Sequence, residues 1–231
     1  MTPAKAPQAP KLTKRAVVDR ALELADSHGL DTLTIRKLAT ELGVTPMALY
    51  WHYRSKEELL GGLVDRVWTE IDTNVDPATP WPGQLRALMD SLVAVLRAHP
   101  AAAHLLLAFD KQSPAAMRPT EITLEVLRGA GFDTEHAAGI ARQALWTGIM
   151  LVMSDPSAEF LSPEELAEHQ RAKQVIYATL PLASYPRVVE CAIPLAAPDD
   201  PEFHYDLGVS IFIAGVEALA ARTGTGRQNP P

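Results

Sequence analysis

Apolar residues recur every three or four positions along most of the chain, which is the spacing of a helix with one buried face. In the first long segment, Val17, Ala21, Leu24 and His28 follow this spacing. No stretch shows the period of two and the β-branched enrichment that mark a strand. The chain is therefore predicted to be all-α. Further helices are expected at 82–98, 101–110, 115–129, 134–153, 163–179 and 202–222.

Capping residues divide the N-terminal part of the chain into four helices, of which the second and third are short and the fourth is longer. A Ser or Thr at a helix start accepts a hydrogen bond from a free backbone N–H group. Pro46 follows such a cap at the first helical position, where its missing N–H costs nothing, and Gly29 and Gly43 suit helix ends. The spacing of Ser55 and Glu58 predicts a capping box. The four predicted caps are Thr13, Thr34, Thr45 and Ser55.

Prolines mark the breaks between the larger parts of the chain. Pro77, Pro80 and Pro82 interrupt the helical pattern, so a domain boundary is expected near residues 72–81. The five prolines of residues 181–201 are expected to break the pattern again. We therefore expect a flexible basic arm at 1–11, an N-terminal domain at 12–72 and a larger helical domain at 81–222.

Charge is divided unevenly along the sequence. The net charge of the whole chain is −7, which by itself argues against a nucleic-acid partner. Residues 1–56, however, hold nine Lys and Arg against five Asp and Glu, whereas residues 57–231 hold twelve against twenty-three. A basic end on an acidic body indicates one segment that faces a polyanion and another with a different role, unless the basic residues cluster by chance.

Residues 34–53 have the layout of a helix-turn-helix, in which a tight turn at Gly43 and Val44 joins two short helices. Glycine tolerates the positive φ of such a turn, and Val44 is expected to fill the angle between the helices. The second helix, expected from Pro46 to Tyr53, is too short to be stable alone. It carries more aromatic side chains than can be buried together, which is typical of a recognition helix that contacts DNA bases and phosphates.

The run TIRKLATELGVTPMALYWHYRSKEELL resembles the DNA-binding domain of the TetR family, the tetracycline-repressor-like bacterial regulators, within a match over about residues 12–70. Two further segments, Tyr185-Pro186-Arg187 and Phe203–Leu219, are similar to the C-terminal domain of the tetracycline-repressor subgroup. The resemblance implies a homodimeric repressor whose two recognition helices enter successive major grooves of a palindromic operator. It also implies that a small molecule, bound in the larger ligand-binding and dimerisation domain, releases the DNA.

The resemblance implies DNA contacts along the helix-turn-helix and at the start of the fourth helix. Met47 and Ala48 suit apolar contact with a thymine methyl group. Lys56 lies where the helix dipole disfavours a cation, and a DNA phosphate beside it would make that place favourable. Trp51 is expected mainly to pack between the two helices. The implied contacts, each of which could instead be an ordinary surface residue, are Thr34, Arg36, Lys37, Thr45, Pro46, Met47, Ala48, Tyr50, Trp51, His52 and Lys56. A DNA-contacting arm would add Lys5, Lys11, Lys14 and Arg15.

Two segments of the larger domain, Ala144–Met153 and Phe203–Ala220, are apolar on more than one face and should be buried on several sides. The resemblance implies that they form a four-helix bundle across a dimer axis, and the alternative is a deep core within one chain. A ligand site is expected among the central helices, although every candidate also suits a core position. The candidate ligand contacts are His104, Phe109, Met117, Gln143, Trp146 and Met150. Asp72 stands where the tetracycline repressor has a drug-binding histidine, which disfavours tetracycline itself.

Other classes of protein find little support in the sequence. It has no nucleophile elbow, phosphate-binding glycine loop or Cys/His pair, so an enzyme is not expected. Its histidines lack metal-site spacing, so no metal or cofactor is expected. Cys191 stands alone, and no apolar run approaches the ~18–20 residues that span a bilayer. The expected protein is soluble and cytoplasmic, and its partners are double-stranded DNA, a second copy of itself and a small molecule, without a membrane.

Two other functions remain open from the sequence. One is a constitutive DNA-binding regulator without an effector, whose larger domain only dimerises. The other is a helical protein that sequesters small molecules and has lost its affinity for DNA. The intact segment from Tyr50 to Lys56 argues against the second.

Overall fold

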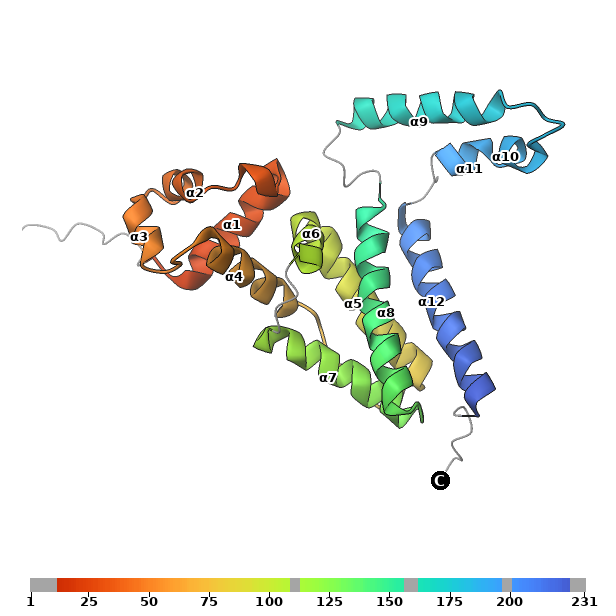
Figure 1. The fold of residues 1–231 in the computed structure, drawn as a ribbon, viewed down its shortest axis with the longest axis horizontal. Helices are drawn as coiled ribbons and strands as arrows, with labels where there is room; N and C mark the ends of the chain where they lie inside the picture. Colours follow the sequence, from red (N-terminus) through yellow and green to blue (C-terminus); the bar gives the residue numbers. More distant parts are fainter. Residues whose placement is uncertain (1–11, 109–112, 156–161, 197–200, 225–231) are drawn as a thin grey trace, which may run out of the picture. The chain divides into compact units, whose positions relative to one another are not determined.

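A computed structural model describes residues 12–108, 113–155, 162–196 and 201–224. Every regular element in these ranges is a helix, which confirms the all-α prediction (Figure 1). The predicted arm at 1–11 lies outside the described residues. The elements are α1 (Lys14–His28), η1 (Leu30–Thr32, a 3₁₀ helix), α2 (Ile35–Glu41), α3 (Pro46–Tyr50), α4 (Lys56–Trp68), α5 (Trp81–Ala98), α6 (Pro100–Ala108), α7 (Pro114–Gly129), α8 (Thr134–Met153), α9 (Pro163–Ala178), α10 (Pro186–Glu190), α11 (Ala192–Ala196) and α12 (Pro201–Thr223).

The helices expected beyond residue 80 are present as α5 to α9 and α12, with bounds within one or two residues of the prediction. The expectation for residues 181–201 was wrong, because α10 and α11 lie there. Pro186 occupies the first turn of α10, where proline is compatible with a helix. This proline therefore starts a short helix where we expected a break.

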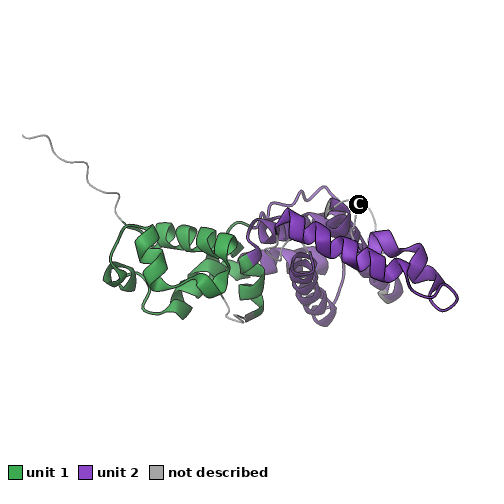
Figure 2. Ribbon diagram, turned by 90° about the horizontal axis from the view of Figure 1, so that it is seen from above, with its two compact units in different colours: residues 1–70, 101–117 green, residues 71–100, 118–231 purple. Residues whose placement is uncertain are grey.

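Contacts between the helices divide the chain into two compact units (Figure 2). Unit 1 contains residues 1–70 and 101–117, and unit 2 contains residues 71–100 and 118–231. Unit 1 thus includes α6, which the sequence placed in the larger domain. Within unit 1, the backbone N–H of Ala101 in α6 donates a hydrogen bond to the Asp26 carboxylate of α1 at 3.3 Å.

In unit 1, α1 packs against α2 and α4, and α2 packs against α3. The core contains Ala21 and Leu24 of α1 together with Leu63 of α4, all of them buried. At Gly62 the chain allows a close approach, since a side-chain carbon there would lie 3.1 Å from the Tyr53 ring. Glycine at this position therefore lets α4 come close to Tyr53, three residues after the end of α3.

In unit 2, α5, α8 and α12 pack against one another (Figure 1). Leu85 and Leu92 of α5, Ile149 of α8 and Val209 of α12 are buried in this contact. Gly148 lets α8 approach α5, because a side-chain carbon there would lie 2.8 Å from Leu92. Burial of each large aliphatic side chain contributes roughly 1.5–3 kcal/mol, so this three-helix contact is the main apolar core of unit 2.

Arginines of α5 also bind α12. Arg86 forms an ion pair with Asp206 and donates to the Ser210 hydroxyl at 2.9 Å. Arg97 donates to both carboxylate oxygens of Glu202, at 2.9 and 2.5 Å. The Arg97 guanidinium holds the pKa of Glu202 below its ordinary value. These pairs neutralise acidic groups of α12 within the same chain.

Tyr205 is a buried polar group of α12. Its hydroxyl donates to the Asp155 carboxylate at 2.6 Å, and the Arg97 guanidinium lies 4.2 Å from the centre of its ring. Burial raises the pKa of Tyr205 well above its ordinary value, and the Asp155 hydrogen bond and charge add to the increase. The side chain therefore stays a neutral donor and links the start of α12 to the end of α8.

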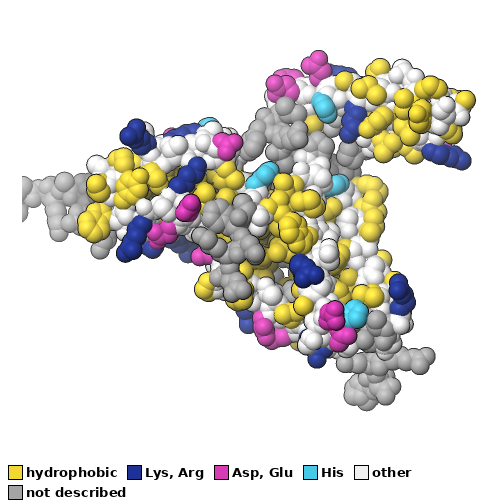
Figure 3. All heavy atoms as spheres, viewed as in Figure 1, with side chains coloured by type: hydrophobic (Ala, Val, Ile, Leu, Met, Phe, Trp, Pro, Cys, Tyr) yellow, Lys and Arg dark blue, Asp and Glu magenta, His cyan; other side chains and the backbone are white. Residues whose placement is uncertain are grey.

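Helices α9, α10 and α11 pack on one another and are named here the α9–α11 hairpin, residues 163–196. None of the side chains of α9 is buried. Figure 3 shows hydrophobic side chains gathered where α10 and α11 lie. The large exposed apolar residues of the hairpin are Val175, Ile176, Leu182, Tyr185, Ile193 and Leu195.

Helix α12 corrects one expectation. Residues Glu202–Arg222 are long and apolar enough to cross a membrane by length and composition, whereas we expected no such run. One such helix is weak evidence for a membrane protein, because core helices of soluble proteins pass the same test. Tyr205, Val209 and Ile213 of this helix are buried against its own unit. Its exposed large apolar residues are Phe203, Leu207 and Ile211.

Candidate nucleic-acid interface

The turn between α2 and α3 has the predicted geometry. Gly43 has a φ of 65°, in the left-handed region where glycine is favoured. The backbone N–H of Val44 donates to the carbonyl of Ala39 at 2.9 Å and closes the end of α2. The hydroxyls of Thr34 and Thr45 accept from backbone N–H groups three residues on, as predicted for helix caps.

Helix α3 is shorter than predicted and depends on its neighbours. It contains only Pro46–Tyr50, and the chain continues in a turn in which the N–H groups of His52 and Tyr53 both bond to the carbonyl of Leu49. A helix of this length is not stable alone. The Leu49 side chain is only 1% exposed, so it anchors α3 to the unit.

Tyr53 is the second anchor of this segment. It is buried, its hydroxyl donates to the carbonyl of Lys14 at 3.4 Å, and the Lys14 ammonium lies 5.2 Å from the centre of its ring. Burial raises the pKa of Tyr53, and the charges of Glu58 and Asp65 raise it further. Tyr53 thus joins the end of the helix-turn-helix to α1 and is unsuited to contact DNA.

The opposite side of the segment is exposed. Met47 is 66% exposed, Tyr50 is 46% exposed and Trp51 is 85% exposed. The expectation that Trp51 packs between the two helices was wrong, because Leu49 and Tyr53 fill the inner side. Three large apolar side chains next to one another on the surface are unusual for a structural turn and mark a surface for a partner.

Unit 1 also carries exposed cations. Arg36 in α2 and Lys56 in α4 are exposed, and neither has an ion pair with any residue that the structure describes. The same holds for Arg54, which we did not predict as a contact, although it directly precedes the Ser55 cap. By contrast, the Lys37 ammonium donates to the Thr32 hydroxyl at 3.3 Å.

The start of α4 differs in detail from the predicted capping box. The Ser55 hydroxyl accepts from the backbone N–H of Glu58 at 3.1 Å, as expected. The Glu58 carboxylate accepts at 2.8 Å from the backbone N–H of Arg54, one residue before the position that a capping box requires. Glu58 also lies 3.8 Å from the Lys14 ammonium, so it is shared between the cap and α1.

The remaining predicted DNA contacts are all at least partly exposed. Thr34, Thr45 and Pro46 are exposed, whereas Lys37, Ala48 and His52 are half-buried. Of the basic residues expected to extend the arm, Lys14 and Arg15 form ion pairs with Glu58 and Asp19. Lys5 and Lys11 lie outside the described residues.

The candidate ligand residues are distributed over both units. His104 and Met117 are exposed in unit 1, whereas Gln143, Trp146 and Met150 are exposed along one face of α8 in unit 2. Gln143 lines a groove of about 640 Å³ between α8 and α12. Phe109 lies outside the described residues. The alternative that each is a core residue fails for these five.

Among the described residues, no group of three or more His, Cys, Asp or Glu side chains could hold a metal ion. Cys191 is an exposed thiol. The chemistry that unit 1 offers is therefore that of an apolar and cationic surface, which suits DNA bases next to phosphates.

Comparison with known proteins decides the family. The model for bacterial regulatory proteins of the tetR family matches residues 17–63, and the model for the tetracyclin repressor-like C-terminal domain matches residues 75–220. The chain belongs to the TetR family. The resemblance of residues 34–60 to this family is thereby confirmed, and the chain is a DNA-binding transcriptional regulator.

Relatives in the TetR family extend over nearly the whole chain. An HTH-type transcriptional regulator of Saccharopolyspora erythraea is 32% identical over 215 residues, which cover 91% of this chain and 87% of the relative. The TetR family protein ActR of Streptomyces coelicolor, solved in complex with actinorhodin, has a TM-score of 0.79 at 29% identity and covers 95% of this chain and 100% of its own. BioQ, solved with its double-stranded DNA operator, has a TM-score of 0.55 at 26% identity over 79% of this chain and 99% of its own.

Proposed function

We propose that this TetR-family regulator binds a palindromic operator as a homodimer, represses transcription there, and leaves the DNA when a small molecule binds its larger unit. The observation that carries the proposal is the exposure of Met47, Tyr50 and Trp51 in the same unit as Arg36 and Lys56, two exposed cations without an ion pair among the described residues. Operator binding by the homologous BioQ supports the DNA part of the proposal.

Each part of this face has a role in DNA binding. Met47 and Ala48 contact thymine methyl groups, and Tyr50 contacts a base edge or a phosphate. Phosphates are neutralised by Arg36 and Lys56. We add Arg54 to these predicted phosphate contacts. The Thr34 and Thr45 hydroxyls accept from helix N–H groups and can still donate their own hydrogen to a phosphate oxygen.

Dimerisation is proposed through α8 and α12. Trp146 and Met150 of α8 and Leu207 and Ile211 of α12 are exposed in the single chain. A two-fold axis would bring the same face of a second copy onto them and bury this apolar surface. The two recognition helices should then lie ~34–36 Å apart, one turn of B-DNA.

Release by a small molecule is supported by the ActR structure, which holds actinorhodin. A ligand needs to favour the DNA-free form of the dimer by only ~1–3 kcal/mol to change DNA affinity by ~5–150-fold. The site of action is the cytoplasm, where operator DNA and metabolites meet.

The test is a selection of the purified full-length chain against random double-stranded DNA at physiological salt. We expect one enriched sequence with two inverted half-sites, their centres one helical turn or a multiple apart. Enrichment of a single half-site would contradict the dimeric mode. A sound dimer that enriches no sequence would instead favour a sequestering protein.

On the selected operator, Lys56→Ala should weaken binding and flatten the dependence of log affinity on log salt by about 1.8, because the dimer loses one phosphate contact from each of its two chains. The matched control is Arg171→Ala, which removes an exposed cation from α9 and should leave both quantities unchanged. If Lys56→Ala kept the wild-type salt slope, Lys56 would not bind a phosphate. If no metabolite released the wild-type protein, a constitutive regulator would be favoured.

A further inference from the structure

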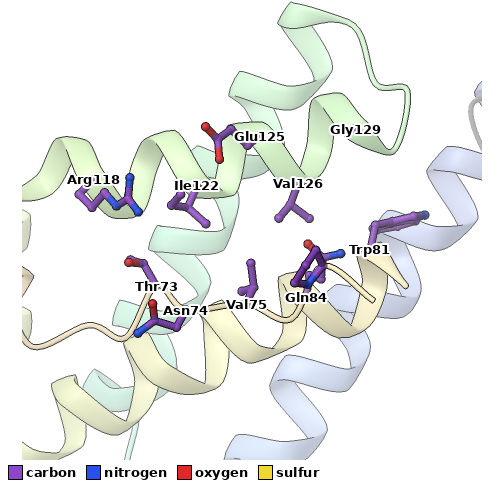
Figure 4. Close-up of a pocket in the computed structure, with 11 residues that line it drawn as sticks. Thr73, Asn74, Val75, Trp81, Gln84, Arg118, Ile122, Glu125, Val126 and Gly129 are labelled. Carbon is purple, nitrogen blue, oxygen red and sulfur yellow. The ribbon is translucent and has the colours of Figure 1, made fainter. Parts of the chain in front are cut away.

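Unit 2 contains a cleft that none of the described candidate ligand residues lines. Its volume is about 590 Å³, within the ~300–1,000 Å³ range of small-molecule sites. The walls are the segment 73–77, the first turn of α5 and one face of α7 (Figure 4). The cleft is thus built from two helices and the stretch of chain that precedes one of them.

The cleft is apolar in the middle and polar at its two ends. Figure 4 shows Ile122 and Val126 of α7 pointing toward Val75. One end carries Arg118 of α7 together with Thr73 and Asn74, and the other carries Gln84 and Trp81 of α5. An elongated molecule with a polar group at each end and an apolar body fits this order.

Several lining groups are held in place without a ligand. The Trp81 ring contacts the Phe132 ring edge to face at 5.9 Å between centroids. The Gln84 amide donates to the carbonyl of Thr79 at 2.7 Å, which leaves its own oxygen able to accept a hydrogen bond. A preformed wall of this kind lowers the entropic cost of binding.

Charge sets the class of ligand. Arg118 is exposed and has no ion pair with any residue in the described part of the chain, so its guanidinium can bind an acid group. Glu125 also lines the cleft, two helical turns further along α7, and a second negative charge on the ligand would meet it there. The lining therefore favours one negative charge at the Arg118 end.

We propose that this cleft binds a small organic monoanion, with its acid group on Arg118, its apolar body between Val75, Ile122 and Val126, and a hydrogen-bond donor on Gln84. Binding at the cleft stands on these residues alone. An effect of the anion on DNA binding rests in addition on the proposed function.

Calorimetry on the full-length chain tests the cleft with 6-hydroxy-2-naphthoate, whose hydroxyl supplies the donor for Gln84, and with its uncharged amide, 6-hydroxy-2-naphthamide. We expect Arg118→Gln to weaken naphthoate binding about tenfold, because it removes a charge-assisted hydrogen bond that is partly exposed to water. Naphthamide binding should not change. Arg171→Gln, which removes an equal charge from α9, should leave both affinities at the wild-type value.

A second variant tests the apolar part of the cleft. Val75→Phe fills the space from a half-buried position outside the helices and should weaken both probes while unfolding at the wild-type temperature. No saturable naphthoate binding to the wild type would overturn the assignment, as would an equal loss of both probes in Arg118→Gln. Operator binding without ligand is measured on the same variants and should equal that of the wild type, so a failure of the proposed function is seen separately from a failure of the cleft.

Discussion

Helices α3 and α12 both expose large apolar side chains, but their charged surroundings are opposite. Beside α3, the cations Arg36, Arg54 and Lys56 have no ion pair among the described residues. Along α12, the acidic Glu202 and Asp206 are neutralised by arginines of α5.

This difference indicates two kinds of partner. Burying an unpaired charge against an apolar surface costs several kcal/mol, so a face with free cations suits a partner that supplies negative charge, such as DNA. Glu202 and Asp206 are already paired within the chain, so an apolar surface can cover these two acids without that cost. The α8 and α12 face is therefore suited to a second protein chain, and the α3 face to a polyanion.

The largest expected effects come from the same substitution in the two faces. Ile211→Asp should raise the dissociation constant of the dimer more than about 100-fold, since it places a carboxylate in an apolar interface. DNA binding should be lost with it. Met47→Asp should leave the dimer intact and weaken DNA binding by roughly tenfold or more, because a carboxylate would face phosphates and bases. Sedimentation equilibrium and operator titration measure the two quantities.

Both substitutions replace an exposed apolar residue, 65% exposed at Ile211 and 66% at Met47, so neither should lower the free energy of unfolding within one chain. Thermal unfolding at a concentration where the wild type is monomeric provides the control. The assignment of one face to DNA and the other to a second chain would be contradicted if Met47→Asp dissociated the dimer, or if Ile211→Asp remained dimeric.

A second pair of substitutions separates the two sides of the α3 segment. Leu49→Ala should lower the free energy of unfolding by about 2–5 kcal/mol, because it leaves a cavity at the main anchor of α3. Trp51→Ala should change it by less than about 0.5 kcal/mol, because the side chain is almost fully exposed. Urea unfolding followed by circular dichroism measures both. A large loss in Trp51→Ala would restore the packing role that the sequence suggested for this residue.

Features set by local sequence were predictable. Thr13, Thr34, Thr45 and Ser55 cap their helices as expected, because a cap depends on residues within one turn. Helices α10 and α11 were missed because five residues are too few to show a helical period. Sequence patterns therefore located the long helices and the turn of the helix-turn-helix.

Features set by tertiary neighbours were not predictable. Trp51 and Tyr53 lie two residues apart in an aromatic run, and only the position of α1 and Gly62 decides that Tyr53 is the buried one. Periodicity likewise predicts that Gln143 and Trp146 lie on one face of a helix. It does not predict which other element packs against that face. The cleft at Arg118 was not predicted because its residues come from segments more than thirty positions apart in the sequence.

A smaller loss of stability than that of Leu49→Ala is predicted for the contact that holds α12 in place. Tyr205→Phe removes the hydrogen bond to Asp155 and should lower the free energy of unfolding by about 1 kcal/mol, with dimer affinity unchanged. Because the folded-state pKa of Tyr205 is raised, its stabilising effect is fully present below the unfolded pKa of about 10 and is lost only as the pH rises through the higher folded value. The difference between wild type and variant should therefore be constant from about pH 6 to pH 9. A difference that already declined within this range would contradict a stabilising hydrogen bond from the neutral Tyr205 phenol to Asp155.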